Sequence, residues 1–283
     1  MIRQIVFPII LSVFVVGCNA TREKTTITID QAISQAPDTL TLIHFETDTL
    51  FRGNQSIHIM VLPKSALQHY QLGMAYSSGP LEKTSWFGRQ SQALTAVNGG
   101  FFDMDKGGSV TYLEIEDSVI HYTQPRGVDS LRWAFPDSLI NGAVILTKDN
   151  HLEISPVRPE SYYENSHQEA AVLVVGPLLL QNGEKYPLPN SKFVTNRHPR
   201  SYLATTPNAI LFVVVDGRSE SANGMTLHEA QQFLLSLGCI DAINLDGGGS
   251  TTLWTNTGGV VNHPSDGAGE RIVANALVVI VNP

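Results

Sequence analysis

The chain has 283 residues, of which 42% are hydrophobic and 16% charged, and its formal net charge is −8. These values are typical of a folded domain with a substantial core, and they exclude a disordered or fibrous chain. The acidic balance argues against nucleic acid as a partner, because binding to a polyanion calls for an excess of basic residues.

The first residues, "MIRQIVFPIILSVFVVGCNA", indicate a segment for export. Arg3 supplies a short positive region, residues 5–16 are almost wholly apolar, and small residues precede Cys18. The spacing resembles the lipobox of bacterial lipoproteins, so we predict a lipoprotein signal peptide over residues 1–17 and lipidation at Cys18. A plain signal peptide or a short membrane anchor are the alternatives. We expect an exported bacterial lipoprotein, anchored to a membrane, in the periplasm or at the cell surface.

The two cysteines give no disulfide framework. If Cys18 carries lipid, Cys239 has no partner, and its apolar surroundings in "LLSLGCIDAINL" favour a buried inert thiol over a nucleophile. Residues 18–40 are rich in threonine without a strong apolar period, which predicts a tether. A single domain is expected over residues 41–283.

From residue 41 onward the chain alternates short β-rich runs with glycine, proline and asparagine. Runs such as "SIHIMVL", "GAVILT", "AAVLVVG" and "AILFVVVD" predict many short strands and few helices. The pattern predicts an α/β fold: one strand-rich domain with a mixed sheet, few helices, and a glycine-rich loop site at strand ends.

One stretch, "TLHEAQQFLLSLG", predicts a helix over residues 226–237. Thr226 and Glu229 have the spacing of a capping box, and Gly238 suits a left-handed stop. Apolar runs at 210–215 and 240–245 flank this helix, as in a crossover between parallel strands. Asp216 and Asp246, which follow those two runs, are therefore expected at the same edge of the sheet.

The stretch "VVVDGRSE" places a carboxylate, a flexible joint and a guanidinium within one turn. Arg218 follows Asp216 and Gly217, and arginine is the side chain best matched to two oxygens of a phosphate or carboxylate. The alternative interpretation is an ordinary Asp-Gly turn with an arginine on the surface.

The stretch "NLDGGGST" is a stronger signal. Three successive glycines after Asp246 are expected where the backbone approaches something closely or takes a positive φ. Free N–H groups in such a loop could form an anion nest, with Ser250, Thr251 and Thr252 as further donors. The pattern is neither a P-loop nor a nucleophile elbow. A glycine-rich hairpin is the alternative.

Two further stretches carry polar residues beside glycine. In "AVNGGFFDMDKGG", Asn98 and Asp103 flank Phe101 and Phe102, which suit either a sugar face or the core. Basic residues in "TNRHPRSYLA" and "NHPSDGAGERIVANALVV" predict a local anion site, although a lone histidine such as His198 is more often structural. The sequence has no zinc motif.

Taken together, "NGGFF", "NRHPRS", "VVDGR", "GMTLHEA", "LGCIDAINLDGGGST" and "VNHPSDGAGERIVANALVV" resemble the phosphodiester glycosidase family. The resemblance is most specific from about residue 94 onward. It implies hydrolysis of the bond between a sugar C1 and a phosphate, and bacterial members are often linked to exopolysaccharide. The positions in the shared motifs are Asn98, Gly99, Gly100, Arg200, Asp216, Arg218, Asn244, Asp246, Gly247, Gly248, Ser250, Arg271 and Asn275.

A glycosyl phosphodiester needs anion-binding groups around its phosphate and a carboxylate near the anomeric carbon, where positive charge develops. We expect the glycine backbone, the arginines and His198 to bind substrate, and Asp216 or Asp246 to be catalytic. No cofactor is expected; Mg²⁺ or Ca²⁺ remains possible without a motif for it. The alternatives are a metal-dependent phosphodiesterase, with those two aspartates holding the cation, and a lipoprotein that binds glycan without turnover.

Overall fold

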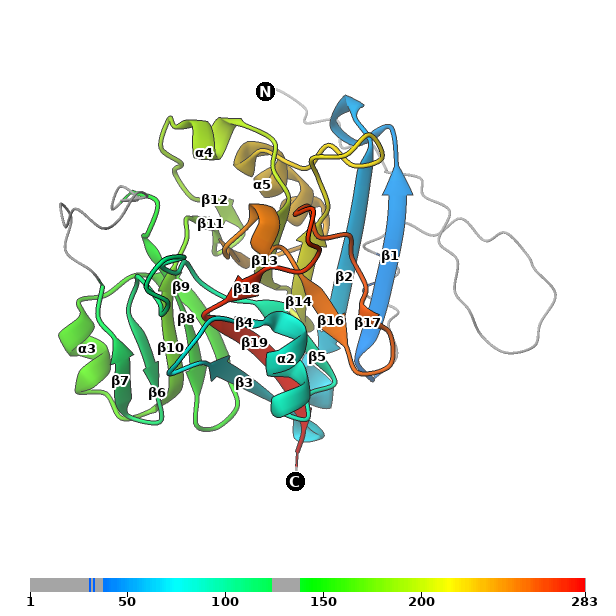
Figure 1. The fold of residues 1–283 in the computed structure, drawn as a ribbon. Helices are drawn as coiled ribbons and strands as arrows, with labels where there is room; N and C mark the ends of the chain where they lie inside the picture. The colour runs from blue at the N-terminus through cyan, green and yellow to red at the C-terminus, as the bar shows by residue number, and fades with distance from the viewer. Residues whose placement is uncertain (1–30, 32, 34–37, 124–137, 283) are drawn as a thin grey trace, which may run out of the picture.

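The computed structural model describes residues 31, 33, 38–123 and 138–282 (Figure 1). The predicted signal peptide and Cys18 lie outside the described residues. Within the predicted tether, Ile33 is buried against the core. None of the helices in the described ranges is long and apolar enough to cross a bilayer.

The described strands form three large sheets and a two-stranded ribbon. The first sheet has the order β1 (Thr41–Thr47), β2 (Gln55–Pro63), β14 (Ala209–Val215), β13 (Arg200–Thr205), β15 (Asp241–Asn244), β11 (Leu178–Gln181) and β12 (Glu184–Lys185). The second has the order β7 (Ser118–His121), β6 (Leu113–Ile115), β10 (Glu169–Val175), β8 (Gly142–Thr147) and β9 (Leu152–Pro156). The third has the order β17 (Gly259–Val260), β16 (Leu253–Thr255), β5 (Thr95–Asn98), β19 (Asn275–Val281) and β3 (Tyr70–Tyr76). The ribbon pairs β18 (Ile272–Val273) with β4 (Glu82–Lys83).

The strand-rich fold with few helices is confirmed, but the mixed sheet is not. Every strand pairing in the described part of the chain is antiparallel. The reason is the position of β13. The strands β14 and β15 run in the same direction, as the long connection between them predicts, but β13 lies between them and pairs antiparallel with both.

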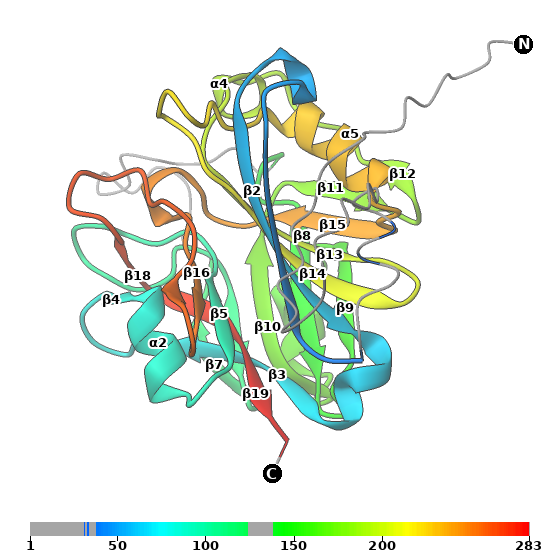
Figure 2. The same ribbon diagram turned by 90° about the vertical axis from the view of Figure 1, so that its right-hand side faces the viewer.

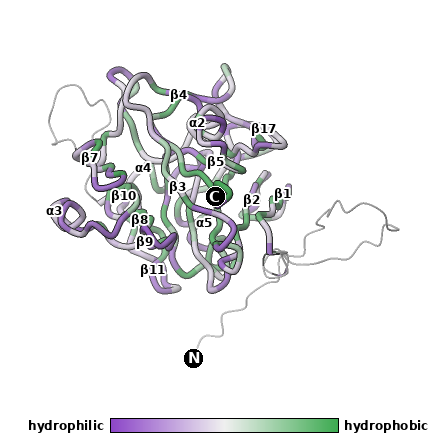
Figure 3. The backbone as a smooth tube through the Cα atoms, turned by 90° about the horizontal axis from the view of Figure 1, so that it is seen from below, coloured by the Kyte–Doolittle hydropathy of each residue, from purple (hydrophilic) through white to green (hydrophobic). Residues whose placement is uncertain are grey.

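The first sheet is the central layer of the molecule (Figure 2). One face packs against α5 (Leu227–Ser236) and α4 (Lys192–Thr195), and the other faces a core shared with the second and third sheets. Strand β14, with the sequence AILFVVV, is buried along its whole length because both faces are covered. The remaining helices, α2 (Thr84–Gln90) and α3 (Glu160–Glu164), lie at the periphery, and α3 is strongly hydrophilic (Figure 3).

Helix α5 begins where the sequence predicts. The Thr226 hydroxyl accepts a hydrogen bond from the Glu229 N–H (3.1 Å), and the Glu229 carboxylate accepts one from the Thr226 N–H (2.9 Å), so the capping box is complete. Gly238 has φ +75°, the left-handed conformation that glycine adopts at little cost. The Glu229 carboxylate also binds Arg197 (Nη2–Oε1, 2.5 Å), which ties the chain entering β13 to the start of the helix.

These connections bring several chain segments to one edge of the first sheet. Arg200 opens β13 opposite Val215, the last residue of β14, and Tyr202 pairs with Asn244 at the end of β15. Asp216 and Asp246 therefore follow strands that end at the same edge, as expected. The third sheet adds the end of β5 and the start of β19, where Asn98 pairs with Ala276.

Candidate active site

A buried asparagine joins the segments that meet at this edge. The Asn98 Nδ2 donates to the Asp246 carbonyl oxygen (2.7 Å), and its Oδ1 accepts hydrogen bonds from the Ser201 hydroxyl (2.7 Å) and the Thr252 N–H (3.1 Å). Asn98 is fully buried, so each of these bonds replaces solvation that the amide has lost. One side chain thus fixes both ends of the glycine loop, residues 246–252, against β13.

A second asparagine holds the backbone that follows Asn98. The Gly100 N–H donates to the Asn275 Oδ1 (2.8 Å), and the Gly99 N–H donates to the Asn275 carbonyl oxygen (3.0 Å). A Cβ at Gly99 would lie 2.0 Å from the Asn275 Oδ1, so only glycine fits there. The Gly99 carbonyl oxygen in turn accepts the Asp246 N–H (2.9 Å). Asn98, Gly99, Gly100 and Asn275 are therefore brought together with Asp246.

A positive φ explains Gly248, and close approach explains Gly249, in the glycine loop. Gly248 has φ +63° within the short 3-10 helix η3 (Gly248–Ser250), and its N–H donates to the Pro199 carbonyl oxygen (2.9 Å). A Cβ at Gly249 would lie 2.1 Å from the Asp266 Oδ1 and 2.2 Å from the Arg271 Nη2. The loop is thus pressed against the ion pair of Asp266 and Arg271, in which the Nε–Oδ2 distance is 2.7 Å.

The loop differs from a nest of consecutive free N–H groups. Backbone N–H groups of four residues already donate within the protein: those of Gly247, Gly248, Ser250 and Thr251. Unused hydrogen-bonding capacity lies instead in buried side chains. The hydroxyls of Thr251 and Thr252 and the Nδ2 of Asn275 have no hydrogen-bond partner among the described residues, although all three residues are at most 1% exposed. Buried polar atoms are normally satisfied, so these groups point to a ligand or bound water.

Asp246 sits at the entrance of the loop and is partly exposed. Burial of its carboxyl group raises the pKa to about 6, and this effect is opposed by the Ser250 hydroxyl, the Gly247 N–H and the positive charges of Arg271 and Arg200. The Oδ1 accepts the Gly247 N–H at 2.8 Å. A carboxyl with such a pKa changes protonation near neutral pH, which is a common property of catalytic groups.

Arg200 is a buried cation without a carboxylate within ion-pair distance in the described part of the chain. It is 1% exposed, its Nε donates to the Met225 carbonyl oxygen (3.2 Å), and its Nη2 donates to that of Phe193 (2.5 Å). The guanidinium also lies over the Phe193 ring, 4.7 Å from its centroid. The pKa of Arg200 is lowered to about 10, chiefly by burial and also by the neighbouring charge of Arg218, while Asp246 opposes the change. The group remains charged at neutral pH.

Arg218 is exposed and has φ +63°, an uncommon conformation for a residue with a side chain. A Cβ at Gly248 would lie 3.0 Å from the Arg218 Nη2, so the guanidinium reaches the glycine loop. Arg218 makes no ion pair with any described residue. Burial lowers the pKa of the half-buried His198, and the positive charges of Arg200 and Arg218 lower it further.

Asp216 has a different environment. Its Oδ1 accepts hydrogen bonds from the Asn262 Nδ2 (3.0 Å) and the His263 N–H (3.0 Å). Its Oδ2 accepts one from the Ser56 hydroxyl (3.0 Å) and lies 3.4 Å from the His58 Nε2. Burial alone would raise the pKa of Asp216, but these hydrogen bonds outweigh it and the pKa lies below its usual value. The carboxylate is 4% exposed and fully engaged by the protein.

Other sequence candidates take structural positions. Asn244 is fully buried, and its Nδ2 donates to the carbonyl oxygens of Gly176 (2.9 Å) and Leu245 (2.6 Å). Phe101 lies in the main core and Phe102 packs in a smaller cluster, as the core interpretation of these rings requires. Cys239 is buried, and burial raises the pKa of its thiol, as expected for an inert cysteine.

Sequence reasoning missed Ser201 and Asn262. Both lie inside stretches that it singled out, "NRHPRS" and "VNHPSDG", but their partners are far away in the sequence. Within the described residues, no group of three or more histidine, cysteine, aspartate or glutamate side chains is arranged to hold a metal ion.

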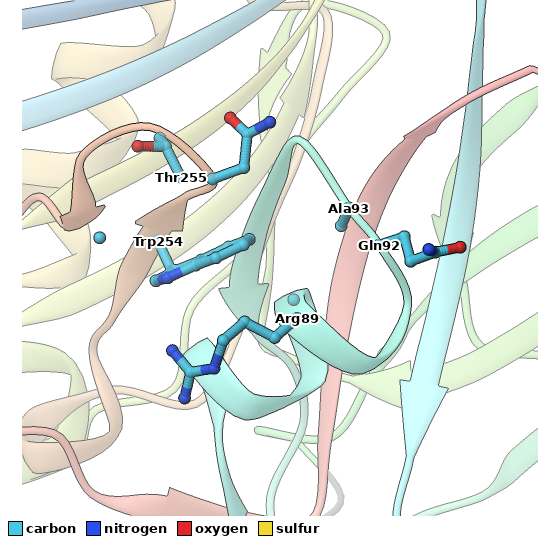
Figure 4. A pocket seen from close by; sticks show the side chains of 8 residues that line it. Arg89, Gln92, Ala93, Trp254 and Thr255 are labelled. Carbon is cyan, nitrogen blue, oxygen red and sulfur yellow. The ribbon is translucent and has the colours of Figure 1, made fainter.

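An open pocket of about 520 Å³ lies elsewhere, between α2 and the strand that follows the glycine loop (Figure 4). Its lining includes Arg89 and Trp254, whose side chains lie beside each other in Figure 4. Thr255, at the end of β16 away from the glycine loop, also lines it. The chemistry-bearing residues described above do not line this pocket, so its volume does not define the candidate site.

Comparison with known proteins agrees with this geometry. A family model described as phosphodiester glycosidase matches residues 91–280. The human N-acetylglucosamine-1-phosphodiester alpha-N-acetylglucosaminidase is 28% identical over 193 residues, which cover 63% of this chain and 35% of that protein. An uncharacterised SPbeta prophage-derived protein of Bacillus subtilis, YomE, is 38% identical over 84 residues, covering 29% of this chain and 13% of that one.

Solved structures share the fold. The catalytic domain of the zebrafish N-acetylglucosamine-1-phosphodiester alpha-N-acetylglucosaminidase, auto-inhibited by its pro-peptide, superposes with a TM-score of 0.66 at 19% identity, covering 87% of this chain and 85% of that one. A hypothetical protein from Synechocystis gives a TM-score of 0.60 at 15% identity, with 86% and 62% covered. Because the family model covers well over half of the sequence, including every segment that meets at the candidate site except residues in β2, the chain belongs to the phosphodiester glycosidase family.

Proposed function

We propose that this protein hydrolyses the bond between a sugar C1 and a phosphate in glycosyl phosphodiesters of a glycan or glycolipid. The observation that carries the proposal is the environment of Asp246. Burial raises the pKa of the Asp246 carboxyl to about 6, the charge of Arg200 acts on this carboxyl, and Arg218 reaches the same loop at Gly248. Neither Arg200 nor Arg218 forms an ion pair with the described residues, and hydroxyls of the same loop are buried without a partner among those residues. That combination suits a substrate in which an anion adjoins a carbon that becomes positively charged.

In this mechanism Asp246 is the catalytic carboxylate. At neutral pH it is mostly ionised, because its pKa of about 6 lies below the ambient pH. Its negative charge stabilises the oxocarbenium character that develops at the anomeric carbon, either electrostatically or by forming a bond to that carbon. Phosphate is a good leaving group, so the need for a strong general acid is relaxed.

Arg200 and Arg218 are assigned to the phosphate. Arg218 reaches the loop from the solvent side and contacts the phosphate, whereas Arg200, which is buried and held by backbone carbonyl oxygens, acts on the phosphate through its charge. Together they stabilise the negative charge that accumulates on the departing phosphate. The Thr251 and Thr252 hydroxyls and the Asn275 Nδ2 are assigned to sugar hydroxyls, since these atoms are buried in or beside the same loop and have no hydrogen-bond partner in the part of the chain that the structure describes.

The test is to identify the bond that breaks. In ¹⁸O-labelled water, attack at the anomeric carbon labels the released sugar and leaves the phosphate unlabelled. The phosphate is the safer reporter, because reducing sugars exchange the C1 oxygen slowly. Label in the phosphate, with activity lost on chelation, would establish a metal-dependent phosphodiesterase instead. Saturable glycan binding without any product would establish a binding protein.

The proposed location is a membrane surface outside the cytoplasm, with a lipid anchor at Cys18. The basis is the lipobox-like spacing of the first residues. Wild-type protein should incorporate labelled palmitate and partition into detergent, whereas Cys18→Ala should do neither. Several acyl chains are needed for stable anchoring, since one chain binds a membrane only marginally. Absence of label in the wild type would remove the anchor from the proposal and leave the enzymatic part intact.

A further inference from the structure

The carboxylate of Asp216 is joined to the glycine loop through one intermediate side chain. Asn262 donates its Nδ2 to the Asp216 Oδ1 (3.0 Å) and also to the Thr251 carbonyl oxygen (3.1 Å). Its Oδ1 accepts the Leu253 N–H (2.8 Å). Asn262 thus contacts the backbone on both sides of Thr252, the residue whose N–H donates to Asn98. All of these groups are at least nine-tenths buried.

Asp216 also fixes the segment that leads from Asn262 to the ion pair at Gly249. It accepts the His263 N–H (3.0 Å), and the chain then continues to Asp266 and Arg271. The ion pair of these two residues lies against Gly249, so close that a Cβ there would clash with both. The glycine loop is therefore contacted at its exit by Asn262 and at Gly249 by Arg271, and both residues belong to the segment that Asp216 holds.

Two residues of the first sheet hold the other oxygen of the Asp216 carboxylate. Ser56 and His58 come from β2, whose residues His58 and Ile57 pair with the end of β14. His58 is 5% exposed, and its ring stacks on that of His44 in β1, with centroids 4.1 Å apart and planes 6° apart. Asp216 therefore joins the first sheet to the third sheet, to which the strand after the glycine loop belongs.

A buried carboxylate with four neighbours is poorly suited to reach a substrate. Both oxygens are occupied by groups of the protein, and freeing one would leave a buried charge with unmet hydrogen bonds. The same arrangement is well suited to hold a loop in one position, because each donor fixes a different chain segment. Functional sites depend on such support, since small displacements of catalytic groups carry large costs in rate.

We propose that Asp216 and Asn262 are positioning residues: they fix the exit of the glycine loop, residues 251–253, and thereby the direction in which the Thr251 and Thr252 hydroxyls and the Asp246 carboxylate face. The inference rests on the proposed glycosidase function for its kinetic consequence, but its structural consequence is independent of any substrate.

The test compares three variants of the full-length chain by hydrogen exchange measured on peptides spanning residues 247–255. Asn262→Ala removes the donor, and Asp216→Asn the charged acceptor, of the hydrogen bond between these two side chains. Asn150→Ala is the matched control, because Asn150 also accepts a backbone N–H, from Leu72 (2.9 Å), and donates to the carbonyl oxygens of Leu67 (3.1 Å) and Tyr70 (2.7 Å). Exchange at 247–255 should rise at least tenfold in the first two variants and stay unchanged in the control.

Kinetics on a glycosyl phosphodiester supply the second readout. Asn262→Ala should lower kcat by about tenfold or more with less than a threefold change in KM, since the loop is misplaced while the phosphate-binding arginines remain. Asn262→Gln, which keeps the amide, should recover part of the loss. If the wild-type chain shows no hydrolysis but exchange responds as expected, the positioning inference stands and the proposed function fails.

Two results would overturn the inference. One is unchanged exchange at residues 247–255 in Asn262→Ala. The other is an Asp216→Asn protein that keeps an ordered loop and yet loses all activity, which would make Asp216 the catalytic carboxylate. If Asp216→Asn does not fold, the Asn262→Ala result decides alone.

Discussion

Two Asp-Gly turns follow two strands that run in the same direction in the same sheet, and they have opposite surroundings. Asp216 is 4% exposed, has hydrogen-bond donors on both oxygens, and has a lowered pKa. Asp246 is partly exposed, accepts one backbone N–H from Gly247, and has a pKa raised to about 6. A carboxylate whose partners are all protein groups stabilises structure, whereas one that remains short of partners is available for a ligand.

The different surroundings of the two aspartates come from residues distant in the sequence. The local sequences are nearly the same, Val-Asp-Gly at 215–217 and Leu-Asp-Gly at 245–247, and do not predict different roles for the two aspartates. Donors that arrive from β2 and from the segment after β17 occupy Asp216, while the groups around Asp246 come mainly from its own loop. The role of each aspartate is therefore set by long-range neighbours.

The largest expected effect is on Asp246. Asp246→Asn should lower kcat by about 10³-fold, because the amide keeps the shape and removes the charge that stabilises the transition state. Its Tm at pH 7 should rise, because the fold raises the pKa of this carboxyl and so disfavours the charge that the amide lacks, while the Gly247 N–H keeps an acceptor. Calorimetry and steady-state kinetics on the same samples provide the check. Full activity in this variant would show that the comparison assigns the two carboxylates wrongly.

The two arginines, like the two aspartates, should differ in how much each contributes to the stability of the fold. Arg218→Lys should lower kcat/KM by about tenfold or more, since a point charge replaces a two-pronged donor to the phosphate. Arg200→Lys should lower it by a similar factor, because an ammonium group cannot make the guanidinium's bonds to the carbonyl oxygens of Met225 and Phe193 and so holds its charge in another place. Only Arg200→Lys should also lower the Tm, because Arg200 alone is buried and bound to several carbonyl oxygens. Unchanged kinetics in both variants would move the phosphate site elsewhere.

The pH dependence of activity should report Asp246. If its ionised form is required, kcat/KM should fall as the pH drops through about 6, the pKa of that group. The loss should follow a single protonation. In Asp216→Asn, residual activity should show the same acid limb. An acid limb that disappears when Asp216 is changed would reverse the two assignments.

The smallest effect concerns the pH dependence of stability. Because the pKa of Asp216 is lowered in the folded state, its ionised form stabilises the fold above the ordinary pKa, and this contribution is lost as the pH falls through the folded value. The Tm difference between wild type and Asp216→Asn should therefore be largest near neutral pH and shrink below about pH 4. A difference that stays constant down to pH 2 would mean that the charge of Asp216 adds no stability.

Local patterns predict much of the fold. The strand runs, the capping box of α5 and the left-handed Gly238 depend on neighbours within a few residues, and the structure agrees with each. The antiparallel arrangement could not be predicted in this way. It depends on β13 entering between β14 and β15, which is a choice among strand partners distant in sequence.

Part of the candidate site could likewise be predicted from local sequence, and part could not. Glycines next to strand ends in the sequence predicted where the backbone of the site would be closely packed. The structure agrees at Gly99 and Gly249, where a Cβ atom would clash with neighbouring side chains. The saturation of Asp216 was not predictable, because its partner Ser56 lies 160 residues away and Asn262 lies 46 residues away. Sequence alone identifies the residue types that meet, and only the fold shows which of them are already satisfied.

The position of β19 in the third sheet has a consequence for synthesis. Residues Asn275–Val281 form an inner strand between β5 and β3, and Asn275 at its start holds the backbone of Gly99 and Gly100. That sheet cannot close until residue 281 has left the ribosome, about 180 residues after Gly100. The backbone of Gly99 and Gly100 therefore meets Asn275 only after nearly the whole sequence has been made, and the candidate site is completed late in synthesis.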